Sequence, residues 1–177
     1  MPDVYEKANL TAAGPEQWDF KKYTPNIISI ALGTNDFSRG DGKKLRLPFD
    51  SATFVNHYTH FVELIKSKYP LAQIALLSSS MVHGDSRNLL QNCLTAVKQN
   101  IDAAHESGKK IALYFFNPMQ AHGCAGHPIV EEHAILANEL SSPEQIMIEK
   151  LLLKITTESK IINVLPELLL IVYIAEV

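Results

Sequence analysis

Two short segments of this chain carry residue types that could do chemistry. The first, Gly33-Thr34-Asn35-Asp36, directly follows an apolar run over residues 27–31, so polar side chains come at the end of a predicted buried strand. Parallel α/β sheets bind ligands beyond the carboxyl ends of their strands. The amide of Asn35 can donate to a developing oxyanion without carrying charge, and Asp36 adds a carboxylate. A local turn is the plainer interpretation, because Asn and Asp also hydrogen-bond their own backbone.

The second segment is a glycine-rich loop, Gly123-Cys124-Ala125-Gly126-His127-Pro128, which precedes a helical pattern. A histidine with an ordinary pKa near ~6.5 can take and return a proton at neutral pH. His127 lies in this loop just before Pro128, which can open a helix, whereas His105, His122 and His133 lack that setting. We therefore predict that His127 is a general base. We predict no metal site, because His122 and His127 have no carboxylate or cysteine partner at a convincing ligand spacing.

A third segment, Gly84-Asp85-Ser86, lies between a predicted strand and a predicted helix, which is the setting of a nucleophile elbow. A helix cap is the simpler interpretation, because Asp and Ser are both good capping residues. We favour the cap and expect Ser86 to lie beyond hydrogen-bond reach of His127. A rearranged site built on Ser86 is the weaker alternative.

The rest of the pattern supplies the elements that must hold these segments. Continuous apolar runs predict strands, and apolar residues at helical spacing predict helices between them. The expected strands cover 25–32, 73–79 and 110–116, and the expected helices cover 52–68, capped by Ser51, 86–105 and 129–140. Strand–helix alternation implies right-handed parallel crossovers in three layers. Because a doubly wound sheet of this kind has about five strands, about two are expected to be absent on the N-terminal side.

Composition fits a globular protein of 177 residues, with 46% hydrophobic and 20% charged residues and a formal net charge of -3. Lys and Arg are scattered, so no basic patch indicates nucleic acid. We expect Cys93 and Cys124 to be free thiols rather than a disulfide. No apolar signal segment follows Met1, which indicates a cytoplasmic protein as written. The apolar run over residues 165–175 is shorter than the ~20 residues of a membrane span.

Four segments together resemble sequence blocks of the SGNH (GDSL-type) esterases, and within them carbohydrate esterase family two. They are Met1-Pro2-Asp3-Val4-Tyr5, Trp18-Asp19-Phe20, Leu32 to Ser38, and Gly123 to Pro128 with His133. The resemblance covers residues 1–140 in order and spacing. It implies a flavodoxin-like three-layer α/β/α sandwich with a parallel sheet (the SGNH hydrolase fold), N-terminally truncated. Residues 141–177 are then an atypical apolar extension.

The resemblance also implies an activity, the hydrolysis of O-acetyl esters on acetylated carbohydrates, without a cofactor. A serine would attack the ester, His127 would be the general base and Asn35 the oxyanion donor, with Gly33 and Thr34 binding substrate. Cys124 stands where most members carry the triad Asp, and Ala125 replaces the Asp that is common beside it. Asp36 or a backbone carbonyl would then have to orient the imidazole.

One difference between this sequence and the family's sequence blocks separates two functional hypotheses. No Gly-Asp-Ser block precedes Gly33, and the glycine of the second family block is absent as well. The first hypothesis is an esterase whose nucleophile comes from a preceding segment missing from this chain. The second is a catalytically inactive remnant that binds glycans or a partner, or has no function. Family members are often exported, whereas no export signal is read here.

Overall fold

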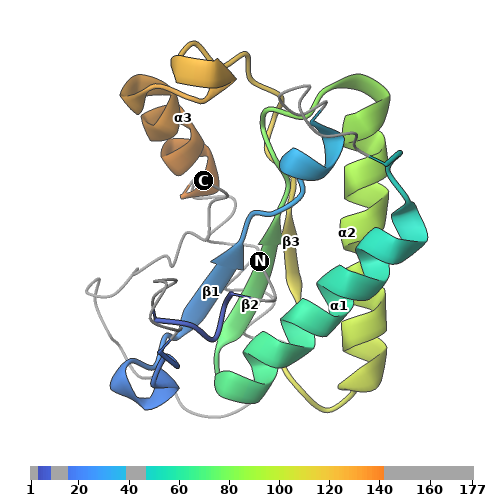
Figure 1. The fold of residues 1–177 in the computed structure, drawn as a ribbon, viewed down its shortest axis with the longest axis vertical. Helices are drawn as coiled ribbons and strands as arrows, with labels where there is room; N and C mark the ends of the chain where they lie inside the picture. Colours follow the sequence, from blue (N-terminus) through green and yellow to red (C-terminus); the bar gives the residue numbers. More distant parts are fainter. Residues whose placement is uncertain (1–3, 9–15, 39–46, 142–177) are drawn as a thin grey trace.

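The computed structural model describes residues 4–8, 16–38 and 47–141. Within them, strands alternate with helices along the chain (Figure 1). In order, the elements are the 3-10 helix η1 (Phe20–Lys22), β1 (Ile27–Ile30), the 3-10 helix η2 (Asn35–Phe37), α1 (Ser51–Lys68), β2 (Gln73–Leu77), α2 (Gly84–Ala104), β3 (Ala112–Tyr114), the 3-10 helix η3 (Cys124–Gly126) and α3 (Val130–Leu140). This order confirms the α/β class expected from the sequence.

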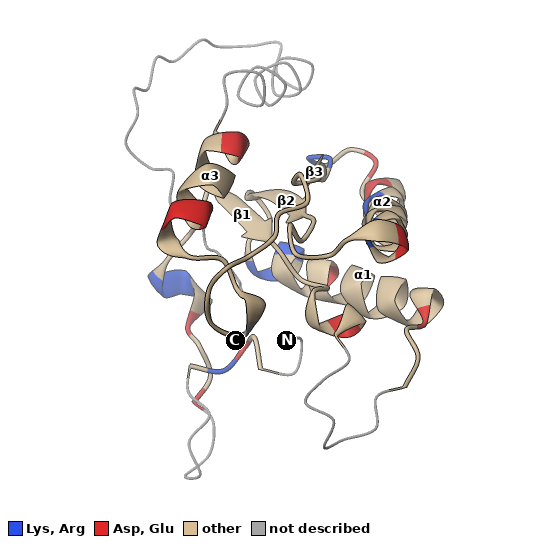
Figure 2. Ribbon diagram, turned by 90° about the horizontal axis from the view of Figure 1, so that it is seen from above, with Lys and Arg blue, Asp and Glu red and all other residues tan. Residues whose placement is uncertain are grey.

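The sheet is parallel, with β2 between β1 and β3. Ile28 pairs with Ile74, and Leu76 pairs with Leu113, which fixes the register on both sides of β2. Right-handed crossovers that step in one direction across a sheet place their helices on the same face. Figure 2 shows this arrangement, with α1 and α2 on one face of the sheet and α3 on the other. The predicted three layers are therefore confirmed.

Two apolar cores lie on the two faces of the sheet, because successive strand residues point to opposite faces. Leu76 belongs to the larger core, with Ile30 of β1 and Leu94 of α2. Its neighbour Leu77 belongs to the smaller core, with Leu136 of α3. Both α1 and α2 bury one stripe of side chains at helical spacing, as the sequence predicts. The buried residues of α1 are Tyr58, Phe61, Val62 and Ile65, and those of α2 are Leu90, Cys93, Leu94, Val97 and Ile101.

The starts of two helices differ from the sequence prediction. Asp50 caps α1 in place of Ser51, because its carboxylate Oδ1 accepts a hydrogen bond from the Thr53 N–H over 2.7 Å. The cap position of α2 is His83, which makes no side-chain capping bond. Asp85 and Ser86 both lie inside the first turn of α2, so the prediction that one of them caps this helix is wrong.

Other expectations concern segments that the structure does not describe. The spacing of Ile146, Met147 and Leu151 predicts a helix over 143–154. This segment and the apolar run over 165–175 lie outside the described residues. In the part that is described, no helix combines the length and the apolar character that crossing a membrane requires.

Candidate functional site

The turn after β1 carries the first predicted group of site residues. Gly33 is buried, whereas Asn35 and Asp36 are exposed at the start of η2. The Phe37 N–H donates to the Thr34 carbonyl over 3.3 Å, which closes the turn. The local turn that the sequence allowed is therefore present, and it holds the two polar side chains beyond the carboxyl end of β1.

Gly33 fixes how closely this turn approaches the helices. Its φ of +118° lies where side chains other than glycine are rarely found. A Cβ on this residue would lie 2.8 Å from Leu90 Cδ1 and 3.4 Å from Phe54 Cζ. Gly33 thus has a structural role that the sequence did not reveal, and its substrate-binding role stays a prediction.

A row of aromatic rings anchors η2 to the N-terminal half of α1. Phe37 stacks on Phe49 with ring centroids 4.3 Å apart, and Phe49 lies 5.3 Å from Phe54. Phe54 in turn lies 5.4 Å from Tyr58. Phe49 was not predicted from the sequence, since nothing in its local pattern distinguishes it from a loop residue. These contacts place Asn35, two residues before Phe37, by apolar packing.

The second predicted site residue, His127, follows η3 on the loop between β3 and α3. Its side chain is exposed, its N–H donates to the Cys124 carbonyl over 3.1 Å, and its carbonyl accepts from the Gly123 N–H over 2.8 Å. Among the described residues, the His127 imidazole has no hydrogen-bond partner. Orientation of this ring by Asp36 therefore stays a prediction.

The imidazole held by a hydrogen bond in this loop is that of His122, which was not predicted as a site residue. Its Nδ1 is paired with Oε1 of Glu132. Glu132 is 7% exposed, and its Oε2 accepts from the Ile129 N–H over 2.8 Å and from the His122 N–H over 3.2 Å. Hydrogen bonds from His122 and Ile129 lower the pKa of Glu132. A glutamate at the third helical position, where it can cap the helix start, was the available sequence signal.

The beginning of the same loop is held by another glutamate of α3. Glu139 Oε1 accepts from the Asn117 N–H over 2.9 Å and from the Tyr114 hydroxyl over 2.9 Å. The Met119 N–H donates to the Ser80 carbonyl over 2.8 Å. The loop is therefore fixed mainly by polar contacts, in contrast to the aromatic anchoring of η2.

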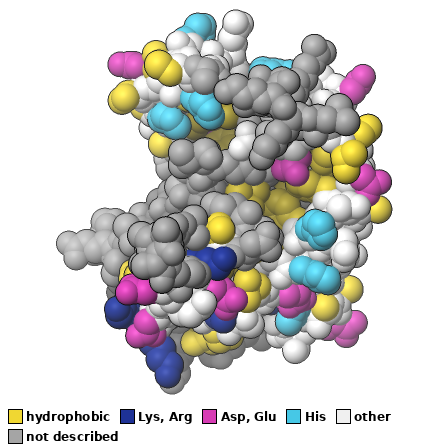
Figure 3. Space-filling view, viewed as in Figure 1, with side chains coloured by type: hydrophobic (Ala, Val, Ile, Leu, Met, Phe, Trp, Pro, Cys, Tyr) yellow, Lys and Arg dark blue, Asp and Glu magenta, His cyan; other side chains and the backbone are white. Residues whose placement is uncertain are grey.

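The sheet topology brings the two groups to the same edge. In Figure 1, η2 and the loop with η3 both lie beyond the carboxyl ends of the strands. Histidine side chains gather over α3 and the loop before it (Figure 3). A contact between Asn35 and His127 stays a prediction. Across the described residues, no hydrogen bond joins Ser86 to His127.

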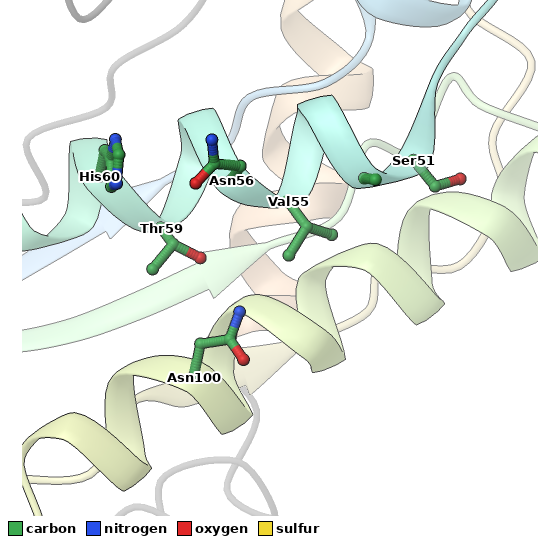
Figure 4. Close-up of a pocket in the computed structure, with 7 residues that line it drawn as sticks. Ser51, Val55, Asn56, Thr59, His60 and Asn100 are labelled. Carbon is green, nitrogen blue, oxygen red and sulfur yellow. The ribbon is translucent and has the colours of Figure 1, made fainter.

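A cavity of about 560 Å³ lies elsewhere, along the groove between α1 and α2. In Figure 4, Thr59 of α1 and Asn100 of α2 face each other across it. The Thr59 hydroxyl is buried and has no hydrogen-bond partner among the described residues. None of the predicted site residues lines this cavity, so it is separate from the candidate site.

The remaining candidate groups are metal ligands and cysteine thiols. In the described part of the chain, no group of three or more His, Cys, Asp or Glu side chains is placed to hold a metal ion. Cys93 is buried and Cys124 exposed, and both are free thiols as predicted.

Known proteins with similar sequences are carbohydrate-active enzymes. The chain is 31% identical over 141 residues to an acetylxylan esterase / glucomannan deacetylase of Cellvibrio japonicus, covering 80% of this chain and 36% of that protein. It is 30% identical over 131 residues to the cellulase/esterase CelE of Acetivibrio thermocellus, covering 71% of this chain and 15% of that protein. No protein-family model matches the sequence.

Solved structures agree with the sequence comparison. A family two carbohydrate esterase from Cellvibrio japonicus superposes with a TM-score of 0.68 at 27% identity, over 85% of this chain and 40% of that one. A family two carbohydrate esterase from Clostridium thermocellum, in complex with cellohexaose, gives a TM-score of 0.63 at 26% identity, over 75% of this chain and 39% of that one. The chain spans less than half the length of each of these proteins. Over the part it spans, it is a relative of the family two carbohydrate esterases in both sequence and fold.

Proposed function

We propose that this chain provides the general base and the oxyanion donor of an esterase that removes O-acetyl groups from carbohydrates. The observation that carries the proposal is the relationship to family two carbohydrate esterases, together with the sheet edge that η2 and the His127 loop share. The relatives' names include acetylxylan esterase and glucomannan deacetylase, and one solved relative binds cellohexaose. These names support an acetylated polysaccharide or oligosaccharide as the substrate.

In the proposed reaction, a serine oxygen attacks the acetyl carbonyl carbon while His127 takes the serine proton. The Asn35 amide donates a hydrogen bond to the oxyanion that forms. His127 then returns its proton to the departing sugar oxygen, so that the sugar leaves as an alcohol and an acetyl-serine remains. Water attacks the carbonyl carbon of this ester while His127 takes a proton from the water. His127 gives this proton to the serine oxygen as acetate is released.

The nucleophile in this proposal belongs to a polypeptide segment outside the residues of this chain. No Gly-Asp-Ser block precedes Gly33 in the sequence. Among the described strands, β1 pairs with β2 along one edge only. A further strand could hydrogen-bond along the other edge of β1 and bring a serine to the carboxyl side of the sheet, next to η2.

A second candidate function is a carbohydrate-binding remnant without hydrolysis. The observation in its favour is the His127 imidazole, which has no hydrogen-bond partner among the described residues. A base without an orienting partner is less effective than one held by a carboxylate. The two functions share a ligand and differ in whether acetate is released.

Hydrolysis of 4-nitrophenyl acetate tests the proposal, with the chain alone and with the polypeptide encoded directly upstream supplied in trans. We expect only background turnover from the chain alone. Adding the upstream polypeptide should restore turnover, and His127→Ala should abolish the restored activity. Asn35→Ala should lower kcat by roughly 10²–10³-fold, as for other oxyanion donors. His133→Ala, an exposed histidine on α3, is the matched control. Turnover by the chain alone that disappears in Ser86→Ala would contradict the proposal and make Ser86 the nucleophile.

A further inference from the structure

The loop that carries His127 closes on itself through backbone hydrogen bonds. The Gly123 N–H donates to the His127 carbonyl over 2.8 Å, and the His127 N–H donates to the Cys124 carbonyl over 3.1 Å. A Cβ on residue 123 would lie 2.6 Å from the His127 carbonyl oxygen, so the closure requires glycine. These bonds fix the backbone around the imidazole. They do not attach the loop to the rest of the fold.

Glu132 makes that attachment from the first turn of α3. One carboxylate bonds both ends of the segment 122–129, because Oε2 accepts from the N–H groups of Ile129 and His122. Oε1 is paired with the His122 ring at Nδ1. With Glu132 only 7% exposed, water competes poorly for these bonds, and hydrogen bonds in such surroundings are strong.

The charge state of Glu132 determines which nitrogen of His122 carries the proton. A helix N-terminus favours a negative charge, and the hydrogen bonds from His122 and Ile129 lower the pKa of Glu132. An ionised carboxylate can only accept hydrogen bonds, so Nδ1 of His122 must be the donor. In neutral His122, Nε2 is then an acceptor, on a side chain that is 66% exposed.

We propose that Glu132 is a positioning residue, which docks the His127 loop onto α3 and sets the tautomer of His122, so that His122 Nε2 accepts a hydrogen bond from a carbohydrate hydroxyl. The ligand's identity rests on the proposed function, whereas the docking and the tautomer do not. A ring whose tautomer and orientation are fixed before binding loses little freedom when the hydroxyl arrives. His127 and His122 thus divide the work, one transferring protons and the other recognising the sugar.

Imidazole ¹⁵N spectra and amide hydrogen exchange test the positioning role on the chain as it stands. In E132Q the amide oxygen still accepts from both backbone N–H groups, while its NH₂ donates to Nδ1, so neutral His122 should move its proton to Nε2. In E132A the Ile129 amide should exchange about tenfold faster or more, because a bond to a charged acceptor is lost. E131Q and E131A are matched controls, since Glu131 is the exposed neighbour on the same helix. An unchanged tautomer in E132Q, or exchange in E132A equal to that in E131A, would overturn the proposal.

Titration with partly acetylated xylo-oligosaccharides and with cellohexaose tests the ligand. We expect the ¹⁵N signal of His122 Nε2 to shift on binding, and the affinity to fall about tenfold in H122A, the loss of one good hydrogen bond. H133A should bind like the wild type. Binding that leaves His122 unperturbed, or no binding at all, would overturn the assignment of the ligand. Binding at His122 with no hydrolysis of the ester, even when the upstream polypeptide is supplied in trans, would count against the proposed function alone.

Discussion

The two halves of the candidate site are held in place by opposite kinds of interaction. The turn after β1 is fixed by apolar packing, with Gly33 against Leu90 and the Phe37 ring on Phe49. The His127 loop is fixed by carboxylates of α3, with Glu132 the best buried of them. Apolar packing does not depend on ionisation, whereas the bonds of a carboxylate do. The packing contacts of the turn after β1 should therefore be insensitive to pH, and the carboxylate contacts of the His127 loop should respond to it.

The largest loss of stability is expected for a substitution that overpacks the turn after β1. Gly33→Ala places a methyl group 2.8 Å from Leu90 Cδ1, in a backbone conformation that alanine rarely adopts. Because Leu90 is fully buried, its side chain has little room to move. Strain and overpacking together should cost about 3 kcal/mol of unfolding free energy, measured by urea denaturation.

Gly84→Ala is the matched control for that measurement. Gly84 also has a positive φ, +56°, but a Cβ there would meet nothing within 4 Å. Only the backbone conformation is then penalised, at about 1 kcal/mol. Equal costs at the two glycines would mean that packing against Leu90 contributes nothing, and would remove the apolar side of the comparison.

The second-largest effect is expected for Gly123→Ala, which should disrupt the His127 loop without disturbing the apolar cores. A Cβ in Gly123→Ala would lie 2.6 Å from the His127 carbonyl oxygen, so the hydrogen bond that closes the loop must be lost. Because residues 122–129 belong to neither apolar core, the unfolding free energy should fall by about 1–2 kcal/mol, less than for Gly33→Ala. Amide signals should change from His122 to Ile129 and stay constant in β1 and α1. Loss of dispersion throughout the spectrum would contradict this division of the molecule.

The contrast also explains which parts of the structure the sequence could predict. The buried stripe of α1, including Phe61 and Val62, is an apolar periodicity. Strand β2, which buries Leu76 on one face and Leu77 on the other, is a continuous apolar run. Such patterns are local and strong. No such pattern decides that Asp50 rather than Ser51 caps α1. The two good capping residues are adjacent, and only the path of the chain decides between them.

The polar half of the site was harder to predict, because its contacts also depend on the path of the chain rather than on a local pattern. Glu132 could be recognised three residues after the helix cap, but its pairing with His122 depends on how the loop folds back over α3. Asn35 and His127 were predicted from their positions after the ends of strands and from their likeness to an enzyme family. Local propensity assigned Asn35 equally well to an ordinary turn, and that turn is present.

A smaller effect should follow from acid alone. The pKa of Glu132 is lowered, so the stability it supplies is present above the pKa of an unfolded glutamate and is lost as the pH falls through the folded value. Below about pH 4, the methyl signals of Ile129 should shift and broaden, whereas those of Leu90 stay constant. In E132Q the acid transition at Ile129 should be absent. Parallel changes at Leu90 in the wild type would show that the whole domain, rather than the loop, responds to acid.

The smallest effect concerns the other end of the loop, where Tyr114 donates to Glu139. In Tyr114→Phe the carboxylate keeps its two bonds from Asn117, and the ring keeps its edge contact with Phe116, so the neutral-pH cost should be about 1 kcal/mol. Burial and Glu139 raise the pKa of Tyr114 to about 12. The folded state therefore holds this proton more tightly than the unfolded state does. That contribution is complete below the unfolded tyrosine pKa of about 10 and is lost as the pH rises toward 12.

Thermal denaturation between pH 9 and about 11.5 measures this contribution, since the unfolded tyrosine ionises over that interval. The wild type should lose stability more steeply than Tyr114→Phe, which has no phenol at this position to titrate. Tyr5, whose pKa burial also raises to about 12, should leave a residual slope in both proteins. Tyr5→Phe should remove this remaining pH dependence. It should not alter the His127 loop, because Tyr5 packs on Phe61 of α1. Identical slopes in wild type and Tyr114→Phe would mean that the Tyr114–Glu139 bond does not hold in solution. The base half of the site would then depend on Glu132 for its charged anchoring.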